Sequence, residues 1–172
     1  DMLMGGKSTY TGRAVAETCY QLIREHSIPA IEAAKTGEPN EHVEALIEAT
    51  VLLSTMAFEN GGLSVSHAIA KGIPLVKRAE RTLHGEHVAY GLLVQLVLEN
   101  RDKAFIQDII DFYKQVNLPH QLAWLGMDKP TDDEIQQIAD IAMTSPSALR
   151  FDRELNADII VNAINDVEGF SQ

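Results

Sequence analysis

The chain has 172 residues, of which 45% are hydrophobic and 23% are charged, as expected for a globular protein large enough to bury a core. Fourteen basic residues against 25 acidic residues give a net charge of −11, which argues against nucleic acid or an anionic membrane as the main partner. The single cysteine, Cys19, excludes an intramolecular disulfide and lies on the apolar side of a helical pattern. We therefore expect a buried thiol and a reducing, cytoplasmic location.

The first third of the chain has helical periodicity. In residues 8–26 the apolar side chains recur at spacings of three and four: Ala14, Val15, Cys19, Leu22 and Ile23. A hydroxyl at Ser8 or Thr9 can cap the start of this helix, because it can accept from the free amides of the first turn. Pro29 is expected to interrupt the helix and to leave a short second helix over residues 29–35.

A longer helix is expected to begin after Asn40, a residue that favours helix N-caps, and to end at Gly61-Gly62. Its predicted inner face is the set of residues that share one side of a regular α-helix: Val43, Leu46, Ile47, Thr50, Leu53 and Ala57. A shorter helix is expected over residues 63–71.

The second half of the chain also reads as helices. Residues 85–100 are the most apolar and predict a central helix, and Thr131 with Glu134 three residues later forms a capping box for another. No strand pattern and no low-complexity linker stand out. The prediction is therefore an all-α fold, a single helical domain over residues 1–172 made of about six to eight helices.

The six histidines are the main candidates for chemistry. His26, His42 and His120 lie in polar or loop contexts, so we expect them at the surface. His67 follows a glycine turn among small neighbours, and His84 precedes the most apolar helix, so the two imidazoles could share a metal ion. Two ligands are fewer than the roughly three that a catalytic zinc needs. The alternative is that both histidines are ordinary polar residues at helix ends.

Three motifs connect these histidines to a known family. The motifs are F-E-N-G-G-L-S-V-S-H-A-I at residues 58–69, H-G-E-H-V-A-Y-G at residues 84–91 and L-V-Q-L-V-L-E-N at residues 93–100. All three resemble the C-terminal helical domain of glycerol dehydrogenases. These enzymes belong to the iron-containing alcohol dehydrogenase superfamily and share the dehydroquinate synthase-like fold. M-G-G-K-S-T at residues 4–9 is similar to the start of the same domain, so the resemblance covers nearly the whole chain.

The resemblance implies a metal-dependent, NAD-linked oxidation of a small polyol such as glycerol. In the family an aspartate and two histidines hold the metal, usually zinc, with iron as the other possibility. The two histidines map onto His67 and His84, and Phe58 matches an aromatic position that lines the alcohol pocket. The cation lowers the pKa of the bound alcohol, and the resulting alkoxide gives a hydride to NAD. NAD is bound by an N-terminal domain that is absent from this chain.

Several departures from the family pattern leave alternatives open. The aspartate ligand of the family lies upstream of the G-G-K segment, so we expect the chain to be a fragment that is inactive alone and binds zinc weakly. Glu59 or Glu86 would be the suspect for a third ligand if zinc bound tightly. Ala70 stands where glycerol dehydrogenases often have a further histidine, and His87 stands where they often have lysine.

These departures leave open a sister dehydrogenase that acts on another small diol or hydroxy acid. From a different class, a helical scaffold or interaction domain that has lost catalysis is the alternative function. A chain without its NAD-binding domain should expose an apolar face, so a homo-oligomer or a partner N-terminal domain is expected to cover it.

Overall fold

The computed structural model describes residues 8–79 and 82–170. The chain divides into two compact units, Asp1–Gly62 and Leu63–Gln172, here called unit 1 and unit 2. No strand occurs in the described residues, so the all-α prediction is confirmed. The grouping of residues 1–172 into one domain stays a prediction, and most of the M-G-G-K-S-T motif lies outside the described residues.

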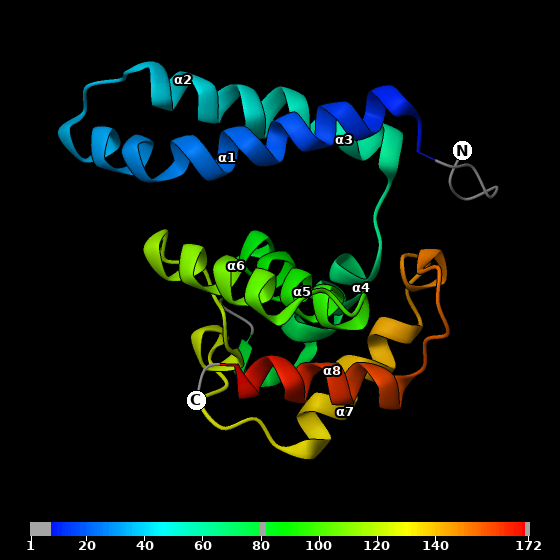
Figure 1. The fold of residues 1–172 in the computed structure, drawn as a ribbon. Helices are drawn as coiled ribbons and strands as arrows, with labels where there is room; N and C mark the ends of the chain where they lie inside the picture. The colour runs from blue at the N-terminus through cyan, green and yellow to red at the C-terminus, as the bar shows by residue number, and fades with distance from the viewer. Residues whose placement is uncertain (1–7, 80–81, 171–172) are drawn as a thin grey trace. The chain divides into compact units, whose positions relative to one another are not determined.

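Unit 1 is a pair of long helices that lie side by side (Figure 1). The first, α1 (Tyr10–Thr36), is capped by Thr9, whose hydroxyl accepts from the Gly12 amide at 2.9 Å. The predicted break at Pro29 is wrong, because α1 runs through this proline without interruption. Proline removes one backbone hydrogen bond, but Ala30 and Ala33, one and four residues after it, are buried, so packing holds the helix together.

The second helix of unit 1 consists of α2 (Glu41–Ile47), the π-helical segment η2 (Glu48–Leu53) and α3 (Ser54–Gly61), which follow one another without a break. Asn40 caps it as predicted, since its side chain accepts from two backbone amides of the first turn. It ends at Gly62, which has φ of 72°, a value that favours glycine.

The predicted inner face of this helix is wrong in its middle. Ala49 is fully buried, whereas Ile47 is 55% exposed and Thr50 is also exposed. The segment η2 begins directly after Ile47, and its i→i+5 hydrogen bonds shift Thr50 and the residues that follow around the helix axis. The hydroxyls of Thr50, Ser54 and Thr55 donate to backbone carbonyls four residues earlier and compete for these acceptors.

Unit 2 begins with α4 (Val65–Gly72), the short 3₁₀ turns η3 (Ile73–Leu75) and η4 (Lys77–Ala79), and α5 (His84–Leu98). It continues with α6 (Lys103–Gln115), η5 (Leu122–Leu125), α7 (Asp132–Met143), η6 (Ala148–Arg150) and α8 (Ala157–Gly169). Because α2, η2 and α3 form one continuous helix, the described residues contain seven helices longer than a short 3₁₀ turn, within the predicted range.

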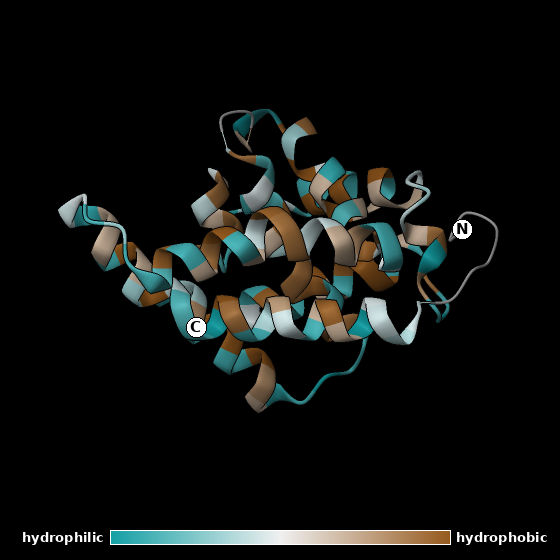
Figure 2. Ribbon diagram, turned by 90° about the horizontal axis from the view of Figure 1, so that it is seen from above, coloured by the Kyte–Doolittle hydropathy of each residue, from teal (hydrophilic) through white to brown (hydrophobic). Residues whose placement is uncertain are grey.

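The apolar helix α5 lies at the centre of unit 2, as predicted. It packs against α4, α6 and α8, and α7 packs against both α4 and α8 (Figure 1). Most of the side chains of α5 are buried or half-buried. Hydrophobic and hydrophilic residues alternate along the length of other helices (Figure 2). None of the described helices combines the length and the apolar character that a membrane span needs.

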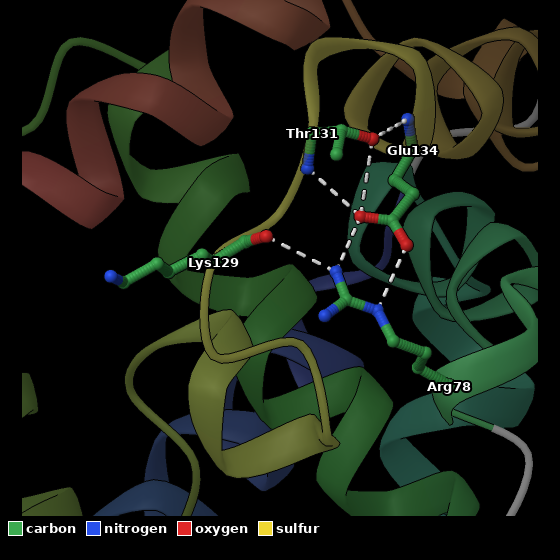
Figure 3. A network of polar contacts seen from close by, with 4 residues as sticks. All are labelled: Arg78, Lys129, Thr131 and Glu134. Carbon is green, nitrogen blue, oxygen red and sulfur yellow. Dashed lines mark hydrogen bonds and ion pairs between the residues drawn. The ribbon is translucent and has the colours of Figure 1, made fainter.

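A polar network ties η4 to the start of α7 (Figure 3). The Arg78 guanidinium donates to both carboxylate oxygens of Glu134, at 3.0 and 2.6 Å, and to the Lys129 carbonyl at 3.1 Å. Glu134 also accepts from the Thr131 amide at 2.8 Å, which completes the predicted capping box. These bonds lower the pKa of Glu134 to about 2, with the bond from Arg78 as the largest cause.

Candidate metal site

His67 and His84, the two histidines predicted to share a metal ion, lie next to each other in unit 2. His67 is on the first turn of α4, and His84 is the first residue of α5. Their ring centroids are 5.9 Å apart, and the ring planes are tilted by 57°. His67 is half-buried and His84 is exposed, so the pair lies where one side is open to solvent.

Close packing between α4 and α5 brings the two rings together. A Cβ added to Gly91 of α5 would lie 2.4 Å from the Ser66 carbonyl oxygen, so only glycine allows this approach. Gln95 of α5 accepts from the Ser66 amide at 3.0 Å and donates to Glu99 at 2.8 Å, which fixes the first turn of α4. Sequence reasoning missed Gln95 as a positioning residue, although a glutamine within the most apolar stretch was a usable signal.

Both the burial and the electrostatics favour a neutral His67. Partial burial lowers the pKa of His67, and the neighbouring His84 lowers it further. A neutral imidazole has a free nitrogen lone pair, which is the form that binds zinc or ferrous iron. The Ser66 hydroxyl lies 3.4 Å from Nδ1 of His67, which leaves Nε2 as the nitrogen available to a ligand.

The separation of the two rings fits a single bridging ion. With a metal–nitrogen bond of about 2.1 Å, a ring centroid stands roughly 3.2 Å from the ion, so two rings on one ion have centroids at most about 6.4 Å apart. The observed 5.9 Å lies inside this limit, which holds for ligands on opposite sides of the ion. At the tetrahedral angle of zinc the centroids would be about 5.2 Å apart, so the two rings would have to approach by roughly 0.7 Å to bind one ion.

A third ligand is missing from the part of the chain that the structure describes. No group of three or more His, Cys, Asp or Glu side chains among these residues is arranged to hold a metal ion. Glu86, one of the two predicted suspects, instead accepts from the Leu83 amide at 2.7 Å and caps α5. Glu59, the other suspect, belongs to α3 of unit 1.

His87, which replaces a common lysine of the family, is a buried structural residue. Its side chain is 4% exposed, and its Nε2 bonds to the Thr82 hydroxyl. That hydroxyl donates to the Ala79 carbonyl at 2.8 Å, so it accepts from a protonated Nε2 of His87. Burial is the main cause of a lowered pKa at His87. His87 thereby ties the start of α5 to the segment before it.

Two further positions named in the sequence are Phe58 and Ala70. Phe58 lies on α3 of unit 1 and is 46% exposed. Its predicted role in the alcohol pocket stays a prediction. Ala70, at the place of a family histidine, is buried within α4 and offers a methyl group only.

The prediction that His26, His42 and His120 lie at the surface is wrong for His120, whereas His26 and His42 are partly exposed. His120 is only 6% exposed and packs against Trp124, with ring centroids 5.3 Å apart. His26 and His42 are half-buried and join α1 to α2, with their Nδ1 atoms 2.8 Å apart. Polar neighbours in the sequence gave no sign of this pairing, which depends on contact between two helices.

Comparison with known proteins identifies relatives over most of the chain. No family model matches it. It is 37% identical over 142 residues to a glycolaldehyde reductase of Halobacterium salinarum, which covers 83% of this chain and 39% of that protein. It is 32% identical over 170 residues to glycerol dehydrogenase 1 of Schizosaccharomyces pombe, which covers 98% of this chain and 38% of that protein. The chain thus spans less than half the length of the curated relatives that it matches.

Solved structures agree. The crystal structure of glycerol dehydrogenase from Schizosaccharomyces pombe matches with a TM-score of 0.92 and 33% identity, over 99% of this chain and 44% of that one. A probable glycerol dehydrogenase from Sinorhizobium meliloti 1021 matches with a TM-score of 0.91 and 33% identity, over 96% of this chain and 47% of that one. A 1,3-propanediol oxidoreductase shares the fold, with a TM-score of 0.74 and 19% identity. The chain therefore belongs to the glycerol dehydrogenase family and corresponds to the C-terminal helical domain of its members.

Proposed function

We propose that this chain is the metal- and substrate-binding part of an NAD-dependent dehydrogenase that acts on a small polyol such as glycerol. The observation that carries the proposal is the pair His67 and His84, whose rings lie 5.9 Å apart. The similarity to a glycolaldehyde reductase and to glycerol dehydrogenases supports a small hydroxylated substrate or its carbonyl product.

His67 and His84 would hold a divalent metal ion, zinc or iron, through one nitrogen each. A bound cation of this kind would lower the pKa of an alcohol hydroxyl and so favour its loss of a proton near neutral pH. The packing of Gly91 and Gln95 against the first turn of α4 keeps the His67 backbone in place, so the two imidazoles need little rearrangement to bind. Phe58 would contribute an apolar wall to the alcohol pocket.

The hydride acceptor would be NAD, held by the N-terminal domain that the family resemblance implies. The chain alone would then lack both the cofactor site and one metal ligand, so it would be inactive by itself. In the working enzyme its partners would be a small polyol, an NAD-binding domain and further copies of the same chain. The single buried cysteine is in keeping with the expected cytoplasmic location.

A chimera tests the proposal directly. The part of Schizosaccharomyces pombe glycerol dehydrogenase 1 that lies outside the matched region would be joined to this chain, and glycerol-dependent NADH formation would be measured. We expect activity that the variants His67→Ala and His84→Ala reduce at least about a hundredfold, because loss of an outer-shell partner alone costs about 10–100-fold.

His42→Gln is the matched control, since it removes one member of the other histidine pair of the described residues. It should keep the activity of the chimera. A chimera that folds and keeps its activity without His67 and His84 would contradict the metal site. It would support the alternative of a helical scaffold whose histidines have no catalytic role.

A further inference from the structure

Three arginines line one cavity of unit 2, near the C-terminal end of α5. The cavity has a volume of about 440 Å³, and its walls include Arg101, Arg150 and Arg153. His84 begins α5, and the 15 residues of this helix correspond to a length of about 22 Å. The cavity therefore lies toward the other end of α5 from His84.

The backbone after α5 brings Arg101 to this cavity. Asn100 has a positive φ of 52°, and its amide donates to the Val97 carbonyl at 2.8 Å. The next amide, that of Arg101, donates to the Leu96 carbonyl at 3.0 Å. These two bonds form a Schellman turn, which ends the helix and redirects the chain. The Arg101 side chain also lies over the Phe105 ring, 5.4 Å from its centroid.

The other two arginines come from η6 and the loop after it. Arg150 is the last residue of η6, and Arg153 follows three residues later. Nη1 of Arg153 donates to the Leu98 carbonyl at 3.3 Å, so the end of α5 holds this guanidinium in place. The three cations thus come from two separate segments of the chain and meet at one hollow.

The charges around the cavity leave an excess of positive charge. Glu99 and Asp152 also line it, so two acidic groups face three arginines and 3 − 2 leaves +1. Glu99 is already engaged, since one carboxylate oxygen accepts from Gln95 at 2.8 Å and the other lies 3.5 Å from Nε of Arg101. In a chain with a net charge of −11, this local excess stands out as a place for an anion.

Arg150, which lines this cavity, has a side-chain nitrogen that lacks a hydrogen-bond partner among the described residues. Its Nε is buried and has no hydrogen-bond partner in the described part of the chain. A charged N–H group kept from water without an acceptor is costly, and an anion in the cavity would offset this cost by neutralising the charge of the same guanidinium. Ser64, where α4 begins, lines the same cavity, and its side chain makes no capping hydrogen bond.

We propose that this cavity binds a phosphate group, either as free phosphate or as a small phosphate ester. Guanidinium groups match phosphate because each can donate two parallel hydrogen bonds to two of its oxygens. The volume exceeds that of a single phosphate, so it leaves room for a small organic group attached to it. The inference does not depend on metal binding by His67 and His84.

Titration calorimetry on the 172-residue chain at low ionic strength tests the proposal, with inorganic phosphate as one ligand and methyl phosphate as the other. We expect one site per chain, and a thermal midpoint that rises with phosphate concentration. Binding of methyl phosphate at least as tight as that of inorganic phosphate would assign the site to phosphate esters, whereas much weaker binding would assign it to the free ion.

Arg101→Gln and Arg150→Gln should each weaken binding about tenfold or more, because each removes charge-assisted hydrogen bonds. Arg101 is exposed, so its substitution should leave the fold intact even if that of Arg150 does not. Arg13→Gln is the matched control, an equal change of charge on α1 of unit 1, and should leave the affinity unchanged. The proposal is overturned if phosphate acts no more than chloride at equal ionic strength, or if Arg13→Gln weakens binding as much as Arg101→Gln.

Discussion

At the scale of single residues, Gly91 is the position on which the histidine pair depends most. Gly91→Ala would place a Cβ 2.4 Å from the Ser66 carbonyl oxygen, so α4 and α5 would have to move apart. We expect a loss of about 1–3 kcal/mol in the free energy of unfolding, the usual cost of overpacking. Zinc binding should weaken as well, because His67 lies next to Ser66. Urea unfolding and zinc titration of the variant measure the two effects.

Gly85→Ala is the control for this prediction, since it makes the same change on the same helix. A Cβ at Gly85 meets nothing within 4 Å, and the residue is helical. We expect this variant to gain about 0.4–1 kcal/mol, because alanine restricts the unfolded chain more than glycine does. Equal stability of the two variants would show that the approach of α4 to α5 is not tight.

Glu134 gives a prediction of pH dependence. Its pKa falls from 4.5 to about 2 in the folded chain, so the folded state holds the proton less tightly than the unfolded state does. The stabilisation is therefore fully present above about pH 4.5 and is lost as the pH falls toward 2. In urea unfolding over this window, the wild-type chain should lose stability more steeply than Glu134→Gln.

Asp133→Asn, a neighbouring exposed carboxylate on α7, is the control and should follow the wild-type slope. If Glu134→Gln also keeps the wild-type slope, the ion pair with Arg78 does not stabilise the folded chain. Because both side chains are partly exposed, added salt should reduce the difference between the wild-type chain and the variant.

At the scale of elements, the helix caps and the central place of α5 could be predicted from the sequence, whereas the course of α1 through Pro29 and the π-helical turns of η2 could not. Thr9, Asn40 and Thr131 cap helices as expected, because a cap depends on a few neighbouring residues. The passage of α1 through Pro29 and the π-helical turns of η2 depend on contacts between α1 and the facing helix. Such contacts override local preference, and no spacing in the sequence reveals them.

For the histidine pair, too, one part could be predicted from the sequence and another part could not. The approach of His67 to His84 was expected from two motifs read together, and the structure places the two rings side by side. The roles of Gln95 and His87 were not predicted, because both rest on partners far from them along the chain or on burial. The pair formed by His26 and His42 was missed for the same reason.

Cys19 offers a direct probe of unit 1. The residue is 7% exposed, its thiol donates to the Ala49 carbonyl of η2 at 3.3 Å, and burial raises the pKa of the thiol. The buried thiol predicted from the sequence is thereby confirmed. Since this is the only cysteine, its reaction with a thiol reagent reports on the separation of α1 from η2. We expect slow labelling of the native chain and labelling at least about a hundredfold faster in urea.

Fast labelling of the native chain, at the rate of an unfolded peptide, would contradict the packing of α1 on η2. Ala49→Gly is a useful comparison, because it loosens the contact without adding a bulky group. This variant should label faster than the wild-type chain. If both label at the same slow rate, the thiol is shielded by something other than the contact with η2.

At the scale of the whole molecule, the chain spans less than half the length of each curated relative that it matches. We therefore make a prediction about the activity of the chain alone. Purified alone and supplied with NAD, glycerol and zinc, the chain should form no NADH above background, because the proposed enzyme also needs a cofactor domain and a further metal ligand. Absorbance at the NADH band measures this. Strong glycerol-dependent NADH formation by the 172 residues alone would overturn the proposed division of labour.

The central claim is that His67 and His84 together form part of a metal site, and calorimetric titration with zinc tests it most directly. The wild-type chain should bind one zinc ion weakly, in the micromolar range or weaker, because two imidazoles leave the site incomplete. The double variant His67→Ala, His84→Ala should lose this binding. Nanomolar binding by the wild-type chain would show that the described residues supply a complete site, and unchanged binding by the double variant would show that the zinc lies elsewhere.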